Sequence, residues 1–137
     1  TDGTDLWLLA TGTGIAPFIS MLCDDYTYTR FKKIHVVWSV RERDELNAFH
    51  DWLTAIDIDY IPIVTRDESW EGENQRITTL INEGKIISNT TSETDKVMLC
   101  GNMDFNIEIR DGLLSKGWTE GSNRQNGSLV LEKAFVG

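Results

Sequence analysis

The fold is decided by residues 6–17, which read LWLLATGTGIAP. The run from Leu6 to Ala10 is wholly apolar, which is typical of a central parallel strand that is covered on both faces. A turn with two glycines follows, and apolar residues then return at helical spacing from Ile15 to Leu22. Pro17 suits the first turn of such a helix, where a missing backbone N–H costs no hydrogen bond. The stretch therefore predicts a strand, a tight turn and a helix.

The same alternation of strand and helix signals continues along the chain. Further strands are predicted at residues 34–38, 58–64, 96–100 and 128–132, and helices around residues 44–53, 76–83 and 104–116. Pro62 predicts that the third strand lies at an edge of the sheet, because proline cannot donate to a strand ladder. Strands that alternate with helices run parallel. The sequence therefore predicts an α/β fold with a three-layer, doubly wound, five-stranded parallel sheet.

Composition narrows the classes of function. The 137 residues fit one domain, residues 1–137, and no apolar run approaches the roughly 18 residues of a membrane span, so no membrane partner is expected. Thirteen Lys and Arg against 22 Asp and Glu give a net charge of −9, which argues against a nucleic-acid partner. Cys23 and Cys100 are too few for a disulfide framework and lack metal-ligand spacing. We expect no metal site and a reducing, cytoplasmic setting.

Doubly wound sheets bind ligands at the carboxyl ends of their strands. After the first strand, the glycines of residues 11–17 allow the backbone to approach a ligand closely, and the following helix directs its first N–H groups to the same place. An anion such as a pyrophosphate fits there. Pro17 nevertheless stands where the fingerprint G-x-G-x-x-G has its third glycine, so a purely structural strand-to-helix turn is the alternative.

Thr65 and Arg66 follow the third strand. A guanidinium and a hydroxyl together can clamp an anion, and a ribose 2′-phosphate at this position would favour NADP over NAD. Arg76, at the start of a predicted helix, is within reach of the same phosphate. The alternative is that both arginines pair with nearby acidic residues, namely Asp67, Glu68, Glu71 or Glu73.

Cys100 and Gly101 follow the fourth strand. Cys100 faces the predicted cleft, although a small buried hydrophobe is the ordinary role of a cysteine. His35 lies inside an apolar strand and His50 inside an amphipathic helix, so neither is placed to activate a thiol, and both are interpreted as structural.

Four segments occur in a fixed order along almost the whole chain: LLATGTGIAPF at 8–18, TRD at 65–67, VMLCGN at 97–102 and LEKAFV at 131–136. Each is modest alone, but the set resembles the Rossmann-like pyridine-nucleotide domain of ferredoxin–NADP+ reductases. The last segment is similar to bacterial members that end in an Ala-Phe-Val tail.

The resemblance implies a cofactor and a set of site residues. Cys100 is expected beside the C4 atom of the nicotinamide, where it shapes the geometry of hydride transfer. Glu132 is expected near the nicotinamide, and Phe135 against the flavin ring. The residues expected to bind NADP(H) are Thr11, Gly12, Thr13, Gly14, Thr65, Arg66, Arg76, Gly101, Asn102, Met103 and Ala134.

Reductases of this kind also carry an N-terminal barrel that binds FAD, whereas this chain begins at the first strand of the nucleotide domain. We therefore expect an excised half, or one chain of a split enzyme, that binds nucleotide but catalyses nothing alone. The parent would pass a hydride between NADPH and FAD, and single electrons between FAD and ferredoxin or flavodoxin. The alternatives are the nucleotide module of an oxygenase or cytochrome-type reductase, and a non-catalytic module that senses NADP(H).

Overall fold

One sheet of six strands organises the protein, which is described here by a computed structural model of residues 5–87, 95–120 and 129–133. The strands lie in the order β3-β2-β1-β4-β6-β5. The first four run parallel to one another, whereas β6 runs antiparallel to both β4 and β5. Their bounds are β1 Asp5–Thr11, β2 Lys33–Val40, β3 Asp59–Val64, β4 Lys96–Cys100, β5 Trp118–Glu120 and β6 Leu129–Lys133.

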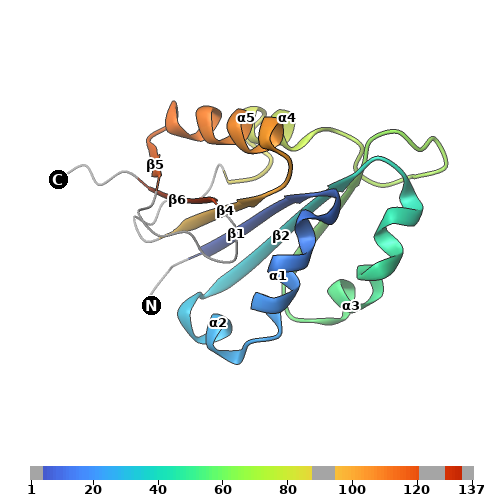
Figure 1. The fold of residues 1–137 in the computed structure, drawn as a ribbon, viewed down its shortest axis with the longest axis horizontal. Coiled ribbons are helices and arrows are strands. Elements are labelled where there is room, and N and C mark those ends of the chain that lie inside the picture. The colour runs from blue at the N-terminus through green and yellow to red at the C-terminus, as the bar shows by residue number, and fades with distance from the viewer. Residues whose placement is uncertain (1–4, 88–94, 121–128, 134–137) are drawn as a thin grey trace.

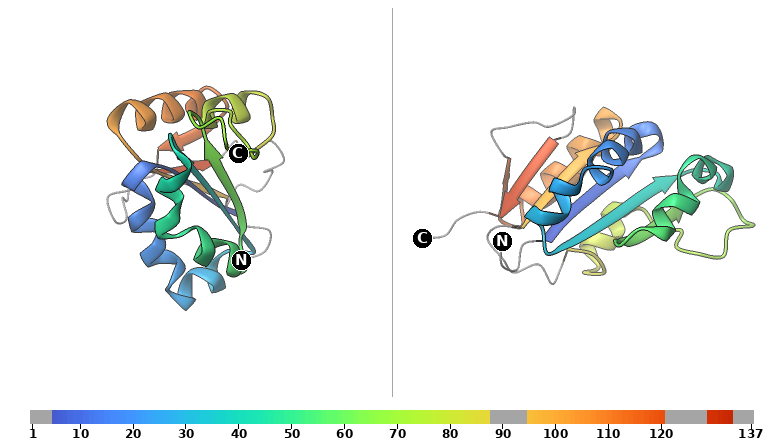
Figure 2. Two further views of the ribbon diagram at one scale, coloured as in Figure 1. Left: turned by 90° about the vertical axis from the view of Figure 1, so that its right-hand side faces the viewer. Right: turned by 90° about the horizontal axis from the view of Figure 1, so that it is seen from below.

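Helices cover both faces of the sheet, with α1, α2 and α3 on one face and α4 and α5 on the other (Figure 1; Figure 2). Within the described residues, none of them is long and apolar enough to cross a membrane. Their bounds are α1 Ile15–Leu22, α2 Asp25–Arg30, α3 His50–Ala55, α4 Ile77–Asn82 and α5 Met103–Leu114, with short 3-10 turns at Gly12–Gly14 and Arg43–Ala48. The predicted three-layer, doubly wound α/β fold is confirmed.

The central strand β1 supplies both halves of the core. Leu6 and Leu8 pack under α1, α2 and α3, whereas Trp7 and Leu9 pack under α4 and α5. This alternation follows from the period of two in a strand, and it explains why an unbroken apolar run was needed there. The prediction that the strand containing Pro62 lies at an edge is also confirmed, because β3 ends the sheet.

The prediction of five parallel strands was wrong in the number of strands and in the direction of the last one. The three-residue strand β5 is too short to give a periodic signal of its own. It pairs with β6, with Thr119 opposite Glu132. The connection between them, residues 121–128, is shorter than the dozen or so residues that a parallel crossover requires, so β6 returns antiparallel.

The order of the strands reverses between β1 and β4. The chain moves from β1 outward to β2 and β3, then returns to the other side of β1 to form β4. Two neighbouring connections therefore leave the sheet in opposite directions above this pair, which opens a crevice at the carboxyl ends of both strands.

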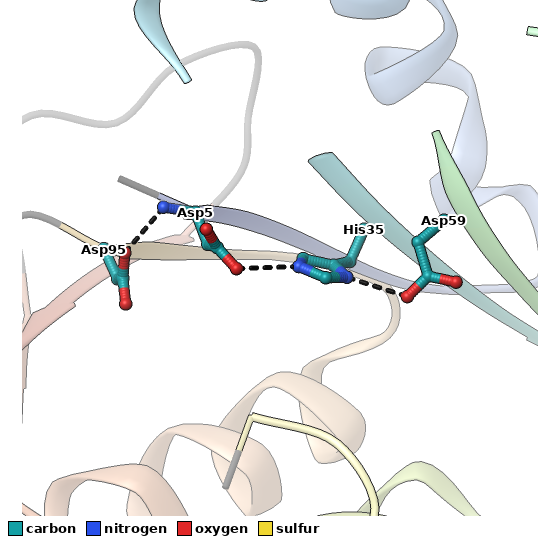
Figure 3. Close-up of polar contacts among 4 residues, drawn as sticks. All are labelled: Asp5, His35, Asp59 and Asp95. Carbon is teal, nitrogen blue, oxygen red and sulfur yellow. Dashed lines mark hydrogen bonds and ion pairs between the residues drawn. The ribbon is translucent and has the colours of Figure 1, made fainter. Parts of the chain in front are cut away.

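At the opposite, amino-terminal end of the sheet, the buried His35 of β2 lies between two carboxylates (Figure 3). Its Nε2 is 2.9 Å from Oδ2 of Asp5 in β1, and its Nδ1 is 2.8 Å from Oδ2 of Asp59 in β3. The imidazole also stacks on Trp7, with ring centroids 3.8 Å apart. A ring nitrogen that carries a proton can donate to the carboxylate beside it. The cluster joins three adjacent strands, in keeping with a structural role for His35.

Replacing this histidine tests the importance of the cluster. His35→Leu leaves two carboxylates facing an apolar side chain, and we expect it to lower the free energy of unfolding by about 2 kcal/mol. Urea denaturation at neutral pH measures the change. His50→Leu is the matched control, because His50 makes a hydrogen bond to the neutral hydroxyl of Tyr60, at 3.0 Å. Equal losses in the two variants would contradict a special contribution from the paired carboxylates.

Candidate functional site

A cleft of about 1020 Å³ opens at the carboxyl ends of β1, β2, β3 and β4. It lies over the crevice where the strand order reverses, so the topology places it where ligands bind in sheets of this kind. Ten of the residues expected from the sequence line it: Thr11, Gly12, Thr13, Gly14, Thr65, Arg66, Arg76, Cys100, Gly101 and Asn102.

The floor of the cleft is formed by two loops that touch through their backbones. A Cβ atom built on Gly14 would overlap the carbonyl group of Cys100, and one built on Gly101 would overlap the hydroxyl of Thr11 and the ring of Phe105. Glycine at both positions therefore allows the loop after β1 to lie directly against the loop after β4. The purely structural interpretation of the glycine turn accounts for Gly14 at this contact.

Gly12 has a different reason to be glycine. Its φ angle is +53°, a conformation that other residues rarely adopt, and a Cβ atom built there would meet no described atom within 4 Å. The backbone of this residue therefore faces open space in the cleft. A ligand can approach it without meeting a side chain.

Two helices begin at the cleft. The eight-residue helix α1 starts directly after Gly14, and α5 starts after Asn102, whose side-chain oxygen accepts a hydrogen bond from the N–H of Phe105 at 2.8 Å. The free N–H groups of a helix start carry partial positive charge. Asn102 is thus a helix cap at the rim of the cleft, a role that its side-chain type indicates.

Thr65 and Arg66 lie at the other side of the cleft, where the backbones after β2 and β3 continue to form hydrogen bonds with each other. The N–H of Thr65 donates to the carbonyl of Val40 at 3.0 Å, and the N–H of Arg66 donates to that of Arg41 at 2.9 Å. These bonds hold Arg41 and Arg66 on neighbouring segments of hydrogen-bonded backbone. Within the described residues, neither guanidinium makes an ion pair.

Arg41 also lines the cleft, and the sequence reasoning missed it. The signal was present, because Arg41 directly follows the strand β2 just as Arg66 follows the β3 strand and Thr65. Applying the rule of strand ends to every parallel strand would have identified it.

Arg76 forms an ion pair with an acidic residue that the sequence did not suggest as its partner. Its Nη2 atom lies 2.7 Å from Oε2 of Glu108 on α5, and the hydroxyl of Thr78 donates to the other oxygen of Glu108 at 2.9 Å. The pairing with Asp67, Glu68, Glu71 or Glu73 that was the alternative is therefore not observed.

Asp67 is engaged elsewhere, in shaping the loop after β3. Its carboxylate accepts from the hydroxyl of Ser69 at 2.6 Å, from the N–H of Ser69 and from the N–H of Arg43. The hydrogen bond from the Ser69 hydroxyl is the largest cause that lowers the pKa of Asp67, and the two N–H groups act in the same direction. The ionised carboxylate thus ties the loop after β3 to the loop after β2.

Cys100 ends β4 and is half-buried in the floor of the cleft, where it also packs against the core under α1. Cys100 therefore packs as a small hydrophobic residue against the core and also lines the cleft, so the two interpretations given for it are compatible. Its backbone carbonyl faces Gly14, as described above.

Two of the expected site residues lie away from the cleft, and two more are not described by the structure. Met103 is 75% exposed at the start of α5 and is not among the lining residues. Because β6 is antiparallel, the backbone of Glu132 pairs with Lys96 at the amino end of β4, away from the cleft. Ala134 and Phe135 lie outside the described residues.

A doubly wound sheet with a cleft above its point of strand reversal is the arrangement in which α/β domains bind nucleotides and other ligands. Sequence comparison agrees: the family described as "Oxidoreductase NAD-binding domain" matches residues 8–110. The chain belongs to this family of oxidoreductase domains.

Known proteins similar to the chain carry more specific names. It is 35% identical to a flavodoxin/ferredoxin–NADP reductase of Rhodobacter capsulatus, with 98% of this chain and 56% of that protein covered. Ferredoxin–NADP reductase A of Sorangium cellulosum is also 35% identical, over 98% of this chain and 54% of its own. The chain spans about half the length of these relatives.

A solved structure of a similar protein agrees with these two sequence comparisons. A ferredoxin NADP+ reductase from Neisseria gonorrhoeae with bound FAD and NADP superposes with a TM-score of 0.81, at 30% identity, over 98% of this chain and 55% of that one. The resemblance expected from the sequence motifs is confirmed.

The contact between the two loops gives a stability prediction. Gly14→Ala places a methyl group against the backbone carbonyl of Cys100, which cannot move aside as a flexible side chain would. We expect a loss of about 1–3 kcal/mol in the free energy of unfolding, measured by chemical denaturation.

Gly112→Ala is the matched control. Gly112 lies inside α5 and a Cβ atom there meets nothing within 4 Å, so we expect a gain of about 0.5–1 kcal/mol. A Gly14→Ala protein as stable as wild type would show that the loops are not in backbone contact.

Proposed function

We propose that this chain is the NADP(H)-binding part of a flavin-dependent ferredoxin or flavodoxin–NADP+ reductase. Residues 1–137 form one nucleotide domain in this proposal, and a separate part of the parent protein holds FAD. The domain orients the nicotinamide for hydride exchange with the flavin, which supplies the conversion between a hydride and single electrons for ferredoxin or flavodoxin. We place the parent in the reducing cytoplasm, which suits the free thiols of Cys23 and Cys100.

One observation carries the coenzyme assignment. Arg41 and Arg66 line the mouth of the cleft, and their guanidiniums make no ion pair within the described part of the chain. In a protein of net charge −9, cations without carboxylate partners are poised for an external anion. A ribose 2′-phosphate is the anion that separates NADP from NAD. The hydroxyl of Thr65 lies beside Arg66 in the lining of the cleft, where it donates a long hydrogen bond of 3.4 Å to the carbonyl of Val40, and in this proposal it donates to the phosphate instead.

The remaining contacts of the nucleotide follow from the shape of the cleft. The open backbone at Gly12 and the start of α1 suit the pyrophosphate, which is doubly anionic. Cys100 and Gly101 lie on the floor of the cleft at the end of β4, next to the glycine loop that follows β1. The nicotinamide end of the nucleotide would lie there. The chain's own residues bind and orient the nucleotide in this arrangement, and Cys100 shapes the surface against which the ring packs.

Nucleotide titration tests the coenzyme assignment. We expect the chain to bind NADP+ more tightly than NAD+ by roughly ten- to a hundredfold, or about 1.5–3 kcal/mol, because charge-assisted hydrogen bonds form to the additional phosphate. Arg66→Ala and Arg41→Ala are each expected to reduce this preference, with NAD+ affinity little changed. Isothermal titration calorimetry measures both affinities.

Arg110→Ala is the matched control, because Arg110 pairs with Asp111 and Glu120 on α5 and β5 and does not line the cleft. It should leave the preference intact. Equal affinities of the unmodified chain for NADP+ and NAD+ would refute the assignment of the 2′-phosphate.

The electron-transfer role is tested on the longer protein that contains this chain. We expect it to oxidise NADPH with ferredoxin or flavodoxin as acceptor, followed by the fall in absorbance of NADPH at 340 nm. A parent that binds NADP(H) tightly but oxidises none would instead support the module that senses NADP(H).

A further inference from the structure

We propose that Trp38 is a positioning residue for the nucleotide, because its indole N–H fixes the peptide group of Gly12 that faces the cleft. This inference rests on the proposed NADP(H) function and adds a residue from β2 that does not itself line the cleft. The Nε1 atom of Trp38 donates to the carbonyl of Gly12 at 2.8 Å.

The first step of the argument is the choice of acceptor. Trp38 is 2% exposed, and a buried indole N–H needs one acceptor because it can only donate. It takes the carbonyl of Gly12, in the loop above the end of the neighbouring strand. Gly12 is also the residue of this loop whose φ angle is positive, at +53°. The bond therefore fixes one of the several conformations that are open to a glycine.

The second step is direction. In a trans peptide group the C=O and the N–H point in opposite directions. With the carbonyl of Gly12 fixed on the indole, the N–H of Thr13 points away from Trp38. Gly12 and Thr13 both line the cleft, and they belong to the first turn that leads into α1, where N–H groups lack intrahelical partners.

The third step is that no described atom holds this residue from its open side. A Cβ atom on Gly12 would meet no described atom within 4 Å, so its open side has no buttress. Trp38 itself is held firmly, because it lies in β2 and its ring lies 6.3 Å from that of Phe49, centroid to centroid. The indole thus transmits the rigidity of the sheet to the loop that meets the nucleotide.

Two ligands separate positioning from general stability. NADP+ engages both the arginines and the glycine loop, whereas adenosine 2′-monophosphate carries only the adenosine and the 2′-phosphate. We expect Trp38→Phe to weaken the binding of NADP+ by about three- to tenfold, the worth of one hydrogen bond, and to leave the affinity for adenosine 2′-monophosphate within about twofold. Trp38→His, which retains a ring N–H donor, is expected to recover part of the loss.

Trp118→Phe is the matched control for the loss of core volume. Trp118 is 3% exposed in β5, at the far edge of the sheet, and does not line the cleft. It should reduce stability without separating the two affinities. If Trp38→Phe weakens both ligands equally, or neither, the positioning role of Trp38 is refuted while NADP(H) binding stands.

A measurement on the unmodified chain keeps the proposal testable if Trp38→Phe does not fold. The indole N–H resonance of Trp38 is expected to shift when NADP+ is added and to stay in place with adenosine 2′-monophosphate. An indole resonance that ignores NADP+ would overturn the positioning role alone. A wild-type chain that binds neither ligand would overturn the proposed function together with this inference.

Discussion

The backbone contact between Gly14 and the carbonyl of Cys100 is the constraint on which the cleft depends. It brings the loop after β1 against the loop after β4, and both loops lead directly into helices. The starts of α1 and α5 therefore converge on one space, where their partial positive charges add. A side chain at position 14 would separate the loops and divide this space. Close packing of the two loops therefore shapes the site, and the charged groups lie around the space that this packing creates.

The opposite wall of the cleft is held in place by hydrogen bonds. Backbone hydrogen bonds continue from β2 and β3 into residues 40–41 and 65–66, and the Asp67 carboxylate adds a bond to the N–H of Arg43. The two arginines of this wall consequently stand on an extension of the sheet. A ligand that uses them does not have to order the backbone first, which reduces the conformational entropy lost on binding. The cleft thus combines a tightly packed floor with a stiffened wall.

The sequence predicted those features that depend on local pattern. The apolar run from Leu6 to Ala10 identified the buried central strand, and the residues after the first, third and fourth strands identified most of the cleft. Pro62 located an edge because its missing donor is a local property. The cofactor was predicted from the resemblance to a known family, which rests on four motifs in a fixed order and not on composition.

Features set by distant contacts were not predictable in the same way. The direction of β6 depends on its pairing with β4 and β5, and the bond from Trp38 to Gly12 joins residues 26 positions apart. The pair between Arg76 and Glu108 spans 32 positions. The enclosure of His35 by carboxylates from two other strands likewise requires the sheet to be assembled first. No periodicity in the chain encodes such partners.

The pairing of Arg76 with Glu108 makes the arginines of the cleft unequal. An anion that approaches Arg76 must compete with a carboxylate already held by that guanidinium and by the hydroxyl of Thr78. The free energy gained there is the difference between two ion pairs, which is small for groups at the surface. Arg76 therefore brings a partly neutralised charge to the cleft, whereas Arg66 makes no ion pair within the described residues.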